Sequence, residues 1–389
     1  MKKHAVVLGG GFAGVQAAID LQASGRFSVT LVSDRDYLFL YPTSIWIPTH
    51  TLAFEGAAVP LEDIRSAHGF NVIVDRVAEI RSSQSLVRME RHELRYDYLI
   101  IAIGADKLKP VGNENTLSIC GKPEASLEIR ERLDALVAAG KGRIAVGFGG
   151  NPRDKSAVRG GPAFEFLFNV DHYLKQKGIR QNFELTFFAP MASPGERMGA
   201  RAVRMVDAMF NKLGIARKYG VKIGSFQPGA VEFEDGTTLH ADLIMFIPGN
   251  AGHPVLQMSD LPLTEAGFIR IDDTGLVDGT TQVYAAGDVA ALEGPEWRAK
   301  QGHIAEVMAR NAVRNILWSD AGSPRREGYQ RHLNILCLMD TGSGAALVYR
   351  DGRRQILIPL PVVGHWMKRA WGKYARWTKT GKVMRLPGL

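Results

Sequence analysis

The chain has 389 residues, of which 46% are hydrophobic and 23% are charged, so it is long enough for two or three domains with large cores. No apolar run reaches the length that a membrane-spanning helix needs. Met1-Lys2-Lys3 leads straight into a predicted strand instead of a secretory leader. With only two cysteines, Cys120 and Cys337, a disulfide framework is excluded. We therefore expect a globular protein that stays on the cytoplasmic side.

Positive charge is concentrated at the end of the chain. The formal net charge is +8, and residues 350–389 hold ten Lys/Arg against a single acidic residue, Asp351. The preceding part of the chain is therefore close to neutral, whereas a nucleic-acid-binding protein more often spreads positive charge over a binding face. We expect no nucleic-acid partner and a basic tail with a function of its own.

The N-terminal segment has the pattern of a dinucleotide-binding unit. Residues 5–8 predict a buried parallel strand, residues 15–21 a helix, and residues 28–32 the next strand. In the loop between them, one glycine permits a tight turn, a second lets the backbone approach a pyrophosphate, and a third lets helix and strand pack closely. The predicted contacts of this loop are Gly9, Gly11, Phe12, Ala13 and Gly14.

A ribose contact is expected about 20 residues after the glycine loop. Ser33 ends the second strand and Asp34 follows it. Either side chain is a candidate for the ribose hydroxyl, and an ordinary surface turn is the alternative.

Strands and helices recur further along the chain. A buried strand is predicted at residues 98–104, and a second unit begins near residue 111. This unit combines strands, one helix and an Asp-Gly hairpin, at residues 143–147, 161–177, 184–188, 231–237 and 241–247. The chain returns to the first unit at about residues 255–290, and residues 302–317 predict a helix. Two βαβ-like units predict an α/β fold with two Rossmann-like domains.

A second glycine-containing signature lies at residues 281–290, where a strand and two small residues precede Gly287 and Asp288. Together with the glycine loop and a middle motif at Ala102 and Gly104, it resembles the glutathione-reductase-like flavoproteins, which have two dinucleotide-binding domains. This resemblance covers nearly the whole chain. It implies that FAD is bound, with Asp288 near the ribityl and pyrophosphate groups.

The chain order of these motifs predicts three parts. They are an FAD-binding domain at 1–110 and 255–325, a degenerate second Rossmann-like domain at 111–254, and a C-terminal region at 326–389. The second domain departs from relatives that oxidise NADH, because its loop at residues 147–152 lacks the third glycine and its next strand ends without an acid at 187–190. NADH binding is disfavoured, although a degenerate loop can still bind phosphate.

Local similarity points to one branch of the superfamily. Several segments resemble the sulfide:quinone oxidoreductases, and sulfide-dehydrogenase subunits of flavocytochrome c share part of the pattern. These segments are residues 34–39 with Pro42 and Trp46, residues 161–166, residues 334–337 with Gly342 and Gly344, and residues 365–368 with Lys373 and Tyr374.

The resemblance implies roles for individual residues. Cys337 matches a flavin-proximal cysteine, whose thiolate attacks the flavin or holds sulfur while two electrons move to it. A buried core thiol is the alternative. Glu165 is a candidate proton carrier, with a surface helix charge as the alternative. Lys300 and Gln301 open the helix beside the expected flavin. A lysine at this place resembles the sulfide branch, whereas a glutamine resembles the type II NADH dehydrogenases. No metal is expected.

One departure from the family pattern concerns the chemistry. The family has a partner cysteine just before the Gly-Pro-Ala-aromatic-Glu motif, where this chain has Val158-Arg159-Gly160. Cys120 resembles a third, less central family cysteine. Three possibilities stay open: Cys120 substitutes for the partner, Cys337 works with a soluble sulfur acceptor, or the donor is not sulfide.

The basic tail has the periodicity of an amphipathic helix. Its apolar residues recur at spacings of three and four: Val363, Trp366, Met367, Ala370, Trp371, Tyr374 and Trp377. Basic residues lie largely off this face, which is typical of an interfacial membrane helix; a helix that packs its Trp side chains into the body is the alternative. We expect residues 362–385 to bind an anionic membrane surface, with the protein peripheral on the cytoplasmic face of the cell membrane. The oligomeric state is left open.

The sequence thus predicts a peripheral membrane FAD-dependent oxidoreductase that passes two electrons from sulfide, or a related small sulfur donor, to a quinone. The alternatives are a type II NADH:quinone oxidoreductase, a flavoprotein sulfide dehydrogenase with another acceptor, and a flavoprotein retained as a binding or sensor module.

Overall fold

The structure is a computed structural model that describes residues 2–385. Its first sheet is parallel and has five strands in the order β19-β9-β1-β2-β5. These strands are β1 (Lys3–Leu8), β2 (Phe27–Ser33), β5 (Asn71–Val74), β9 (Tyr98–Ile101) and β19 (Val283–Ala285). The helices α1 (Phe12–Ala23) and α8 (Gly302–Asp320) pack against each other and the sheet. An antiparallel sheet of β6 (Val77–Arg81), β7 (Leu86–Met89) and β8 (Glu93–Arg95) adds to the same core.

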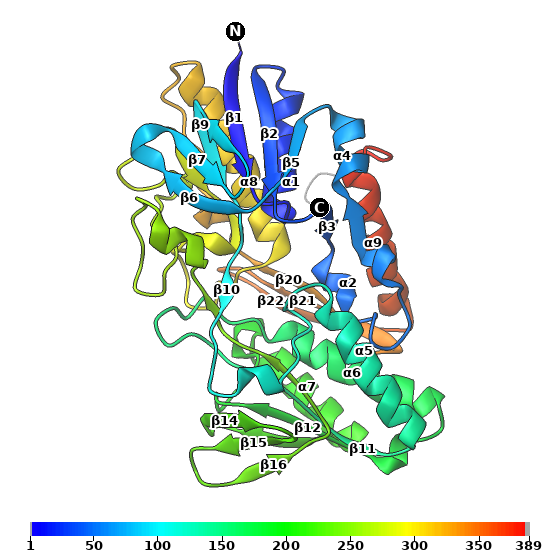
Figure 1. The fold of residues 1–389 in the computed structure, drawn as a ribbon. Coiled ribbons are helices and arrows are strands. Elements are labelled where there is room, and N and C mark those ends of the chain that lie inside the picture. The colour runs from blue at the N-terminus through cyan, green and yellow to red at the C-terminus, as the bar shows by residue number, and fades with distance from the viewer. Residues whose placement is uncertain (1, 386–389) are drawn as a thin grey trace.

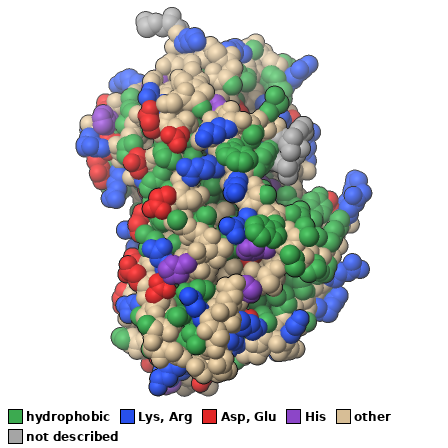
Figure 2. Space-filling model, turned by 90° about the vertical axis from the view of Figure 1, so that its right-hand side faces the viewer, with side chains coloured by type: hydrophobic (Ala, Val, Ile, Leu, Met, Phe, Trp, Pro, Cys, Tyr) green, Lys and Arg blue, Asp and Glu red, His purple; other side chains and the backbone are tan. Residues whose placement is uncertain are grey.

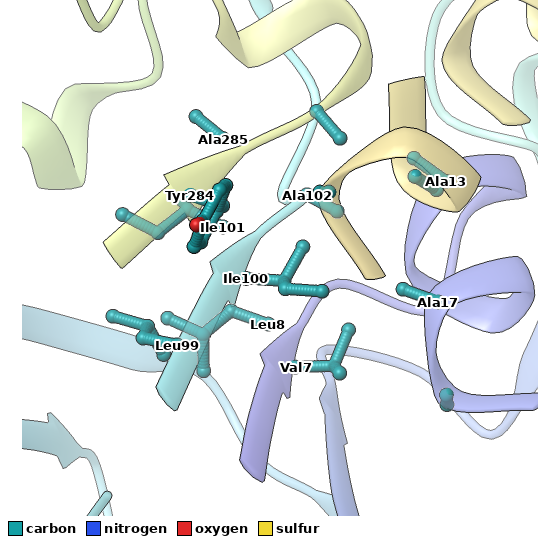
Figure 3. Packing of buried hydrophobic residues seen from close by; sticks show 14 of the residues in the cluster. Val7, Leu8, Ala13, Ala17, Leu99, Ile100, Ile101, Ala102, Tyr284 and Ala285 are labelled. Carbon is teal, nitrogen blue, oxygen red and sulfur yellow. The ribbon is translucent and has the colours of Figure 1, made fainter. Parts of the chain in front are cut away.

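Small side chains let α1 approach this sheet closely. Ala13 and Ala17 of the helix lie opposite the apolar strand residues Val7, Ile100 and Ala102 (Figure 3). All of them are buried. Unbroken runs of apolar residues are what a parallel sheet needs when it is covered on both faces.

A second lobe is built around a parallel sheet in the order β13-β12-β11-β17 (Figure 1). Its strands are β11 (Gly142–Phe148), β12 (Phe183–Ala189), β13 (Ala216–Tyr219) and β17 (Leu243–Ile247), and its helices are α5 (Ala125–Ala139), α6 (Gly161–Gln176) and α7 (Ala200–Leu213). A smaller sheet contains β14 (Ile223–Gln227), β15 (Ala230–Phe233) and β16 (Thr238–His240). Aromatic rings fill the core, with Phe164 and Phe187 stacked at 4.7 Å.

The C-terminal region lies between and beside the two lobes. An antiparallel sheet of β20 (Ile335–Asp340), β21 (Gly344–Arg350) and β22 (Gln355–Pro361) is seen between the lobes in Figure 1, and α9 (Val363–Lys379) runs along one side. Shorter elements complete the chain: β3 (Tyr37–Phe39), α2 (Tyr41–Ser44), α3 (Phe54–Ala57), β4 (Ala58–Pro60), α4 (Leu61–His68), β10 (Asp106–Lys107) and β18 (Asn250–Ala251).

The predicted α/β fold with two parallel sheets is confirmed. One strand is shorter than predicted, because the segment expected at 98–104 leaves the sheet after Ile101. There the chain turns under the glycine loop, and Gly104 has a φ of +77°. The three-part domain division stays a prediction. It is supported by the fact that each sheet within the described residues draws its strands from one predicted part, except the two-stranded sheet of β10 and β18, which joins the first part to the second.

Two buried lysines fix α9 to both lobes. Lys368 pairs with Glu165 of α6 in the second lobe. Lys379 Nζ lies 2.7 Å from Glu306 Oε1 of α8 and 2.6 Å from Gln16 Oε1 of α1, and Arg385 also binds Glu306, at 2.7 Å. The expectation that the tail's basic residues lie at a membrane surface is therefore wrong for Lys368 and Lys379. Their long side chains reach inward and supply part of the compensation that the two buried carboxylates need.

We expect Lys379→Met to lower the free energy of unfolding by about 3 kcal/mol, because removing one partner of a buried ion pair leaves the other charge poorly compensated. Lys373→Met is the matched control, since Lys373 is exposed on the same helix. The measurement is the midpoint of urea unfolding of the FAD-loaded protein. Equal midpoints for the two variants would contradict a clamp at Lys379.

Candidate active site

The carboxyl ends of the parallel strands β1, β2, β9 and β19 meet at one edge of the first sheet. The glycine loop follows β1 at this edge. Gly9 has a φ of +107°, and a Cβ atom there would lie 2.3 Å from the Ala102 carbonyl oxygen. A Cβ atom on Gly14 would lie 1.8 Å from the Gly9 oxygen, whereas one on Gly11 would meet no atom within 4 Å. Gly9 and Gly14 are therefore needed for packing, and Gly11 faces open space at the start of α1.

The end of β2 separates the two candidates for a ribose contact. Ser33 is buried beneath the loop, where a Cβ atom on Gly10 would lie 2.3 Å from its hydroxyl oxygen. Asp34 is exposed and lies 3.5 Å from Arg35 Nε. That nitrogen is buried and has no hydrogen-bond partner. An exposed carboxylate and an unsatisfied guanidinium donor thus stand beside the glycine loop.

Asp288 lies after β19 in an ionic contact between the two lobes. Arg159, which precedes α6, places Nη2 2.5 Å from Asp288 Oδ2. Burial opposes ionisation of Asp288, but the charges of Arg159, Lys300 and Lys107 outweigh it and hold its pKa below the ordinary value. Asp288 is therefore an anion at neutral pH, and Gly287 before it packs against the small side chains of Ala13 and Ala305.

Lys300 stabilises the segment around Asp288 from beneath. Its buried Nζ donates to the carbonyl oxygens of Asp288 and Ala290, both at 2.7 Å, and lies 3.3 Å from the centroid of the Phe268 ring. Burial lowers the pKa of Lys300 to about 7. A role for this residue at the cofactor stays a prediction, and in the structure it holds the backbone of residues 288–290.

The start of α8 joins the glycine loop to the C-terminal sheet. Gln301 is the residue before the helix, and its Oε1 accepts a hydrogen bond of 3.4 Å from the Leu336 backbone nitrogen. The Phe12 ring lies beside Gly302, 3.6 Å from where a Cβ atom would be. This arrangement brings β20, which carries Cys337, to the same edge as the glycine loop.

Cys337 lies beside a buried polar cluster made of Glu165, Asn169, Asp340, His365 and Lys368. Glu165 Oε1 accepts hydrogen bonds from the Asp340 backbone nitrogen, at 2.8 Å, and from Lys368. The Asp340 carboxylate accepts from Asn169 at 2.9 Å and interacts with His365 Nδ1 at 2.8 Å. The cluster therefore links α6, β20 and α9.

Electrostatics in this cluster favour the neutral forms of Glu165 and Cys337, whereas His365 and Lys368 outweigh burial at Asp340 and hold its pKa below the ordinary value. Burial raises the pKa of Glu165, and the charge of Lys368 opposes the rise only in part. Burial also raises the pKa of Cys337 to about 12, and Glu165 adds to the shift. The interpretation of Glu165 as a surface charge is wrong, because its side chain is buried between three elements.

Cys120 is a second buried thiol in the same hydrophobic core against which Cys337 packs. Burial raises its pKa, the charges of Arg159 and Lys107 lower it, and Glu165 raises it again. Glu165 thus raises the pKa of both thiols, whereas the positive charges of Arg159 and Lys107 lower the pKa of Cys120.

Three charged residues of the site were not among the predicted site residues. Lys368 lies in the segment 365–368 that resembles the sulfide:quinone oxidoreductases, but that resemblance implies no role for it, and Asp340 belongs to no motif. Arg159 lies in the segment 158–160, where the family has a cysteine. The spacing of Lys368 does place it on the face opposite Trp366, which is the signal that it points inward. The partners Asp340 and Arg159 come from distant segments, so their contacts required the fold.

Comparisons with known proteins agree with this arrangement. Residues 3–312 match the family model described as "Pyridine nucleotide-disulphide oxidoreductase". The chain belongs to this family. It is 27% identical to a sulfide-quinone reductase of Aquifex aeolicus over 97% of this chain and 91% of that protein. The solved sulfide:quinone oxidoreductase structure from the same bacterium superimposes with a TM-score of 0.88, covering 99% and 93% of the two chains at 25% identity. An NADH dehydrogenase-like protein of Mycobacterium tuberculosis is 22% identical over 74% of this chain and 72% of its own length.

The protein is an FAD-dependent oxidoreductase, and its predicted resemblance to the sulfide:quinone oxidoreductases is confirmed. The residues fit the cofactor, because Gly11 leaves room for a pyrophosphate at the helix N-terminus. FAD supplies reversible uptake of two electrons.

We expect substitutions of two glycines in the loop to have different effects. Gly11→Val adds a side chain in the open space, so it should abolish FAD retention while the apoprotein still folds. Gly14→Val should instead destabilise the fold by several kcal/mol, since its Cβ atom would overlap the Gly9 oxygen. The measurements are flavin absorbance per chain and thermal melting of both apoproteins. Full FAD occupancy in Gly11→Val would refute this assignment.

Proposed function

We propose that this enzyme oxidises sulfide, or a related small sulfur compound, and passes the two electrons through FAD to a quinone at the membrane. The observation that carries the proposal is the position of Cys337, on a strand next to Gln301 and the cluster of Glu165 and Lys368, in a chain that aligns with a sulfide-quinone reductase over 97% of its length. A thiol beside an electron acceptor can hold sulfur atoms while they are oxidised.

Proton transfer is assigned to Glu165. Reduction of a quinone consumes two protons, and a carrier works best when its pKa lies close to the working pH. Burial raises the pKa of Glu165 above its ordinary value, and its neighbour Lys368 donates a hydrogen bond to the carboxyl group. We therefore assign the buried cluster two roles: it links α6, β20 and α9, and its Glu165 supplies protons.

The donor side differs from the family pattern at residues 158–160, which include Arg159 and stand where a partner cysteine is expected. The Arg159 guanidinium is bound to Asp288 and lies near Cys120. We propose that Cys337 is the principal thiol and that Cys120 has a secondary role. Contacts of FAD are assigned to Gly9, Gly11, Phe12, Ala13, Gly14, Asp34, Ala102, Gly104, Gly287, Asp288 and Gln301, with Ser33 and Lys300 supporting them from beneath.

The outward face of α9 supports a membrane contact. Figure 2 looks at the side of the molecule that carries α9 in Figure 1 and shows hydrophobic side chains gathered there with basic ones around them. Trp366 is 61% exposed, and Val362, Val363, Met367, Trp377 and the β22 residues Ile356 and Ile358 are exposed as well. No helix within residues 2–385 is long and apolar enough to cross a bilayer. Aromatic and aliphatic side chains at this density suit an interface with lipid.

Two side chains of the predicted apolar face are placed differently. Trp371 and Tyr374 are half-buried, and Trp371 packs against the first core. The alternative in which the helix packs its tryptophans into the body thus holds for Trp371 alone, while Trp366 and Trp377 point outward. Cytoplasmic-face attachment stays a proposal.

A type II NADH:quinone oxidoreductase is the second candidate, supported by the NADH dehydrogenase-like relative. The structure speaks against a tight phosphate turn in the second lobe, because β11 ends at Phe148 and α6 begins only at Gly161. Between them, Asn151 donates to the Asn250 carbonyl oxygen at 2.9 Å, which ties the loop to the segment after β17. Stopped-flow bleaching of the flavin by sulfide and by NADH separates the two candidates.

We expect Cys337→Ser to reduce sulfide-dependent flavin bleaching to the background rate while FAD content is unchanged, because a serine hydroxyl is a far weaker nucleophile than a thiol. Cys120→Ser is the matched control and should have the smaller effect. If the two substitutions are equally damaging, Cys120 has taken over the partner role, and if Cys337→Ser bleaches normally, its thiol only packs.

We expect Trp366→Ser to weaken binding to anionic vesicles by roughly tenfold to a hundredfold, since a large apolar side chain is lost from the interface. Met258→Ser is the control, because Met258 is 70% exposed and lies outside α9. Co-sedimentation with vesicles gives the affinities, and quinone reduction should fall more than donor-side bleaching. Equal pelleting of both variants would show that α9 is not the membrane contact.

A further inference from the structure

A polar cavity opens beside the exposed face of α9. Its volume is about 160 Å³, and its walls come from α6, α9 and the segment after α2. At about 30 Å³ for each water molecule, this is room for roughly five waters, which is enough for a group with one central atom and four oxygens. The lining includes Thr49, Thr51, His172, Gln176, His365 and Arg369.

The lining is rich in hydrogen-bond donors and carries positive charge. Arg369 has no ion pair or hydrogen bond with any residue in 2–385, and its guanidinium only lies over the Trp366 ring, at 5.4 Å. No carboxylate of the described residues lines the cavity. The nearest acids are engaged elsewhere: Asp340 binds His365, Asn169 and Gly342, and Asp134 binds His50. A planar guanidinium without a partner, next to hydroxyl, amide and imidazole groups, is the donor set that recognises a tetrahedral oxyanion.

The cavity is continuous with the face proposed to contact lipid. The Trp366 ring, which is exposed, lies near both Arg369 and His365, whose ring centroid is 6.2 Å away. If the anion in the cavity is the phosphate group of a lipid, the acyl chains of the same lipid can therefore lie over Trp366 and Met367. A free oxyanion of the same chemistry would fit the walls equally, but it would make no use of this neighbourhood.

We propose that this cavity binds the phosphate group of an anionic phospholipid and so fixes α9 in a defined orientation on the membrane. The inference rests on the proposed membrane contact of α9. It goes beyond that contact by assigning a specific headgroup site, with Arg369 as the principal ligand and His172 on the opposite wall.

The test compares variants that keep the charge of α9 with one that changes it. Arg369→Lys retains the positive charge but loses the planar fork, and His172→Ala alters only the wall on α6. Lys373→Gln removes a charge from an exposed position outside the cavity. Vesicles of phosphatidylcholine with and without 30% phosphatidylglycerol are used with the FAD-loaded protein. We expect about tenfold weaker binding to phosphatidylglycerol vesicles for the two cavity variants, a smaller loss for Lys373→Gln, and no change on pure phosphatidylcholine.

The outcomes separate the inference from the proposal beneath it. If wild-type protein does not bind vesicles at all, the membrane contact itself is wrong. If it binds but Lys373→Gln loses as much as Arg369→Lys, the attraction is diffuse and the headgroup site is refuted. Calorimetric titration with inorganic phosphate tests the other source of the anion. Saturable phosphate binding that depends on Arg369, together with unchanged vesicle affinity in Arg369→Lys, would assign the cavity to a free oxyanion and overturn the lipid assignment.

Discussion

The placement of α9 depends on two buried lysine–glutamate pairs, and much of the site depends on α9. Lys368 binds Glu165 in the second lobe, and Lys379 binds Glu306 in the first. Because both lysines point inward, the opposite side of the helix is forced outward, and that side carries Trp366 and Met367. The exposed apolar face of α9 thus follows from the pairing of its two buried lysines with Glu165 and Glu306.

The two glutamates differ in how far their charge is compensated. Burial opposes ionisation in both, but Glu306 has two cations, Lys379 and Arg385, which hold its pKa below the ordinary value. Glu165 has Lys368 alone, and its pKa stays raised. The contact of Glu306 with Lys379 and Arg385 therefore favours the ionised carboxylate, whereas the pair of Glu165 and Lys368 lies beside Cys337 and burial favours the protonated form of its carboxyl group.

Much of this could be predicted from the sequence because the signals are local. The glycine loop lies between a strand and a helix, and its three glycines have separate steric reasons that any parallel βα turn imposes. The amphipathic period of the tail likewise predicted which residues of α9 face outward, apart from Trp371 and Tyr374. What could not be predicted depends on segments that meet only in the fold. The burial of Glu165 follows from β20 and α9 packing over α6, and no local pattern around Glu165 contains that information. The same holds for Lys379, whose partners Gln16 and Glu306 lie more than sixty residues away in sequence.

Arg159 shows how one replacement reorganises a site that is otherwise similar to its relatives. It lies in the segment 158–160, which stands where the family resemblance implies a second cysteine, and its guanidinium bridges the lobes by binding Asp288. A cation there favours any thiolate at Cys120, but it cannot accept sulfur. The sulfur chemistry proposed for Cys337 would then need a small acceptor, or a second thiol outside the family's usual position. The charge of Arg159 is paired with the Asp288 carboxylate, so this guanidinium belongs to an ionic contact between the lobes and is not a free cation.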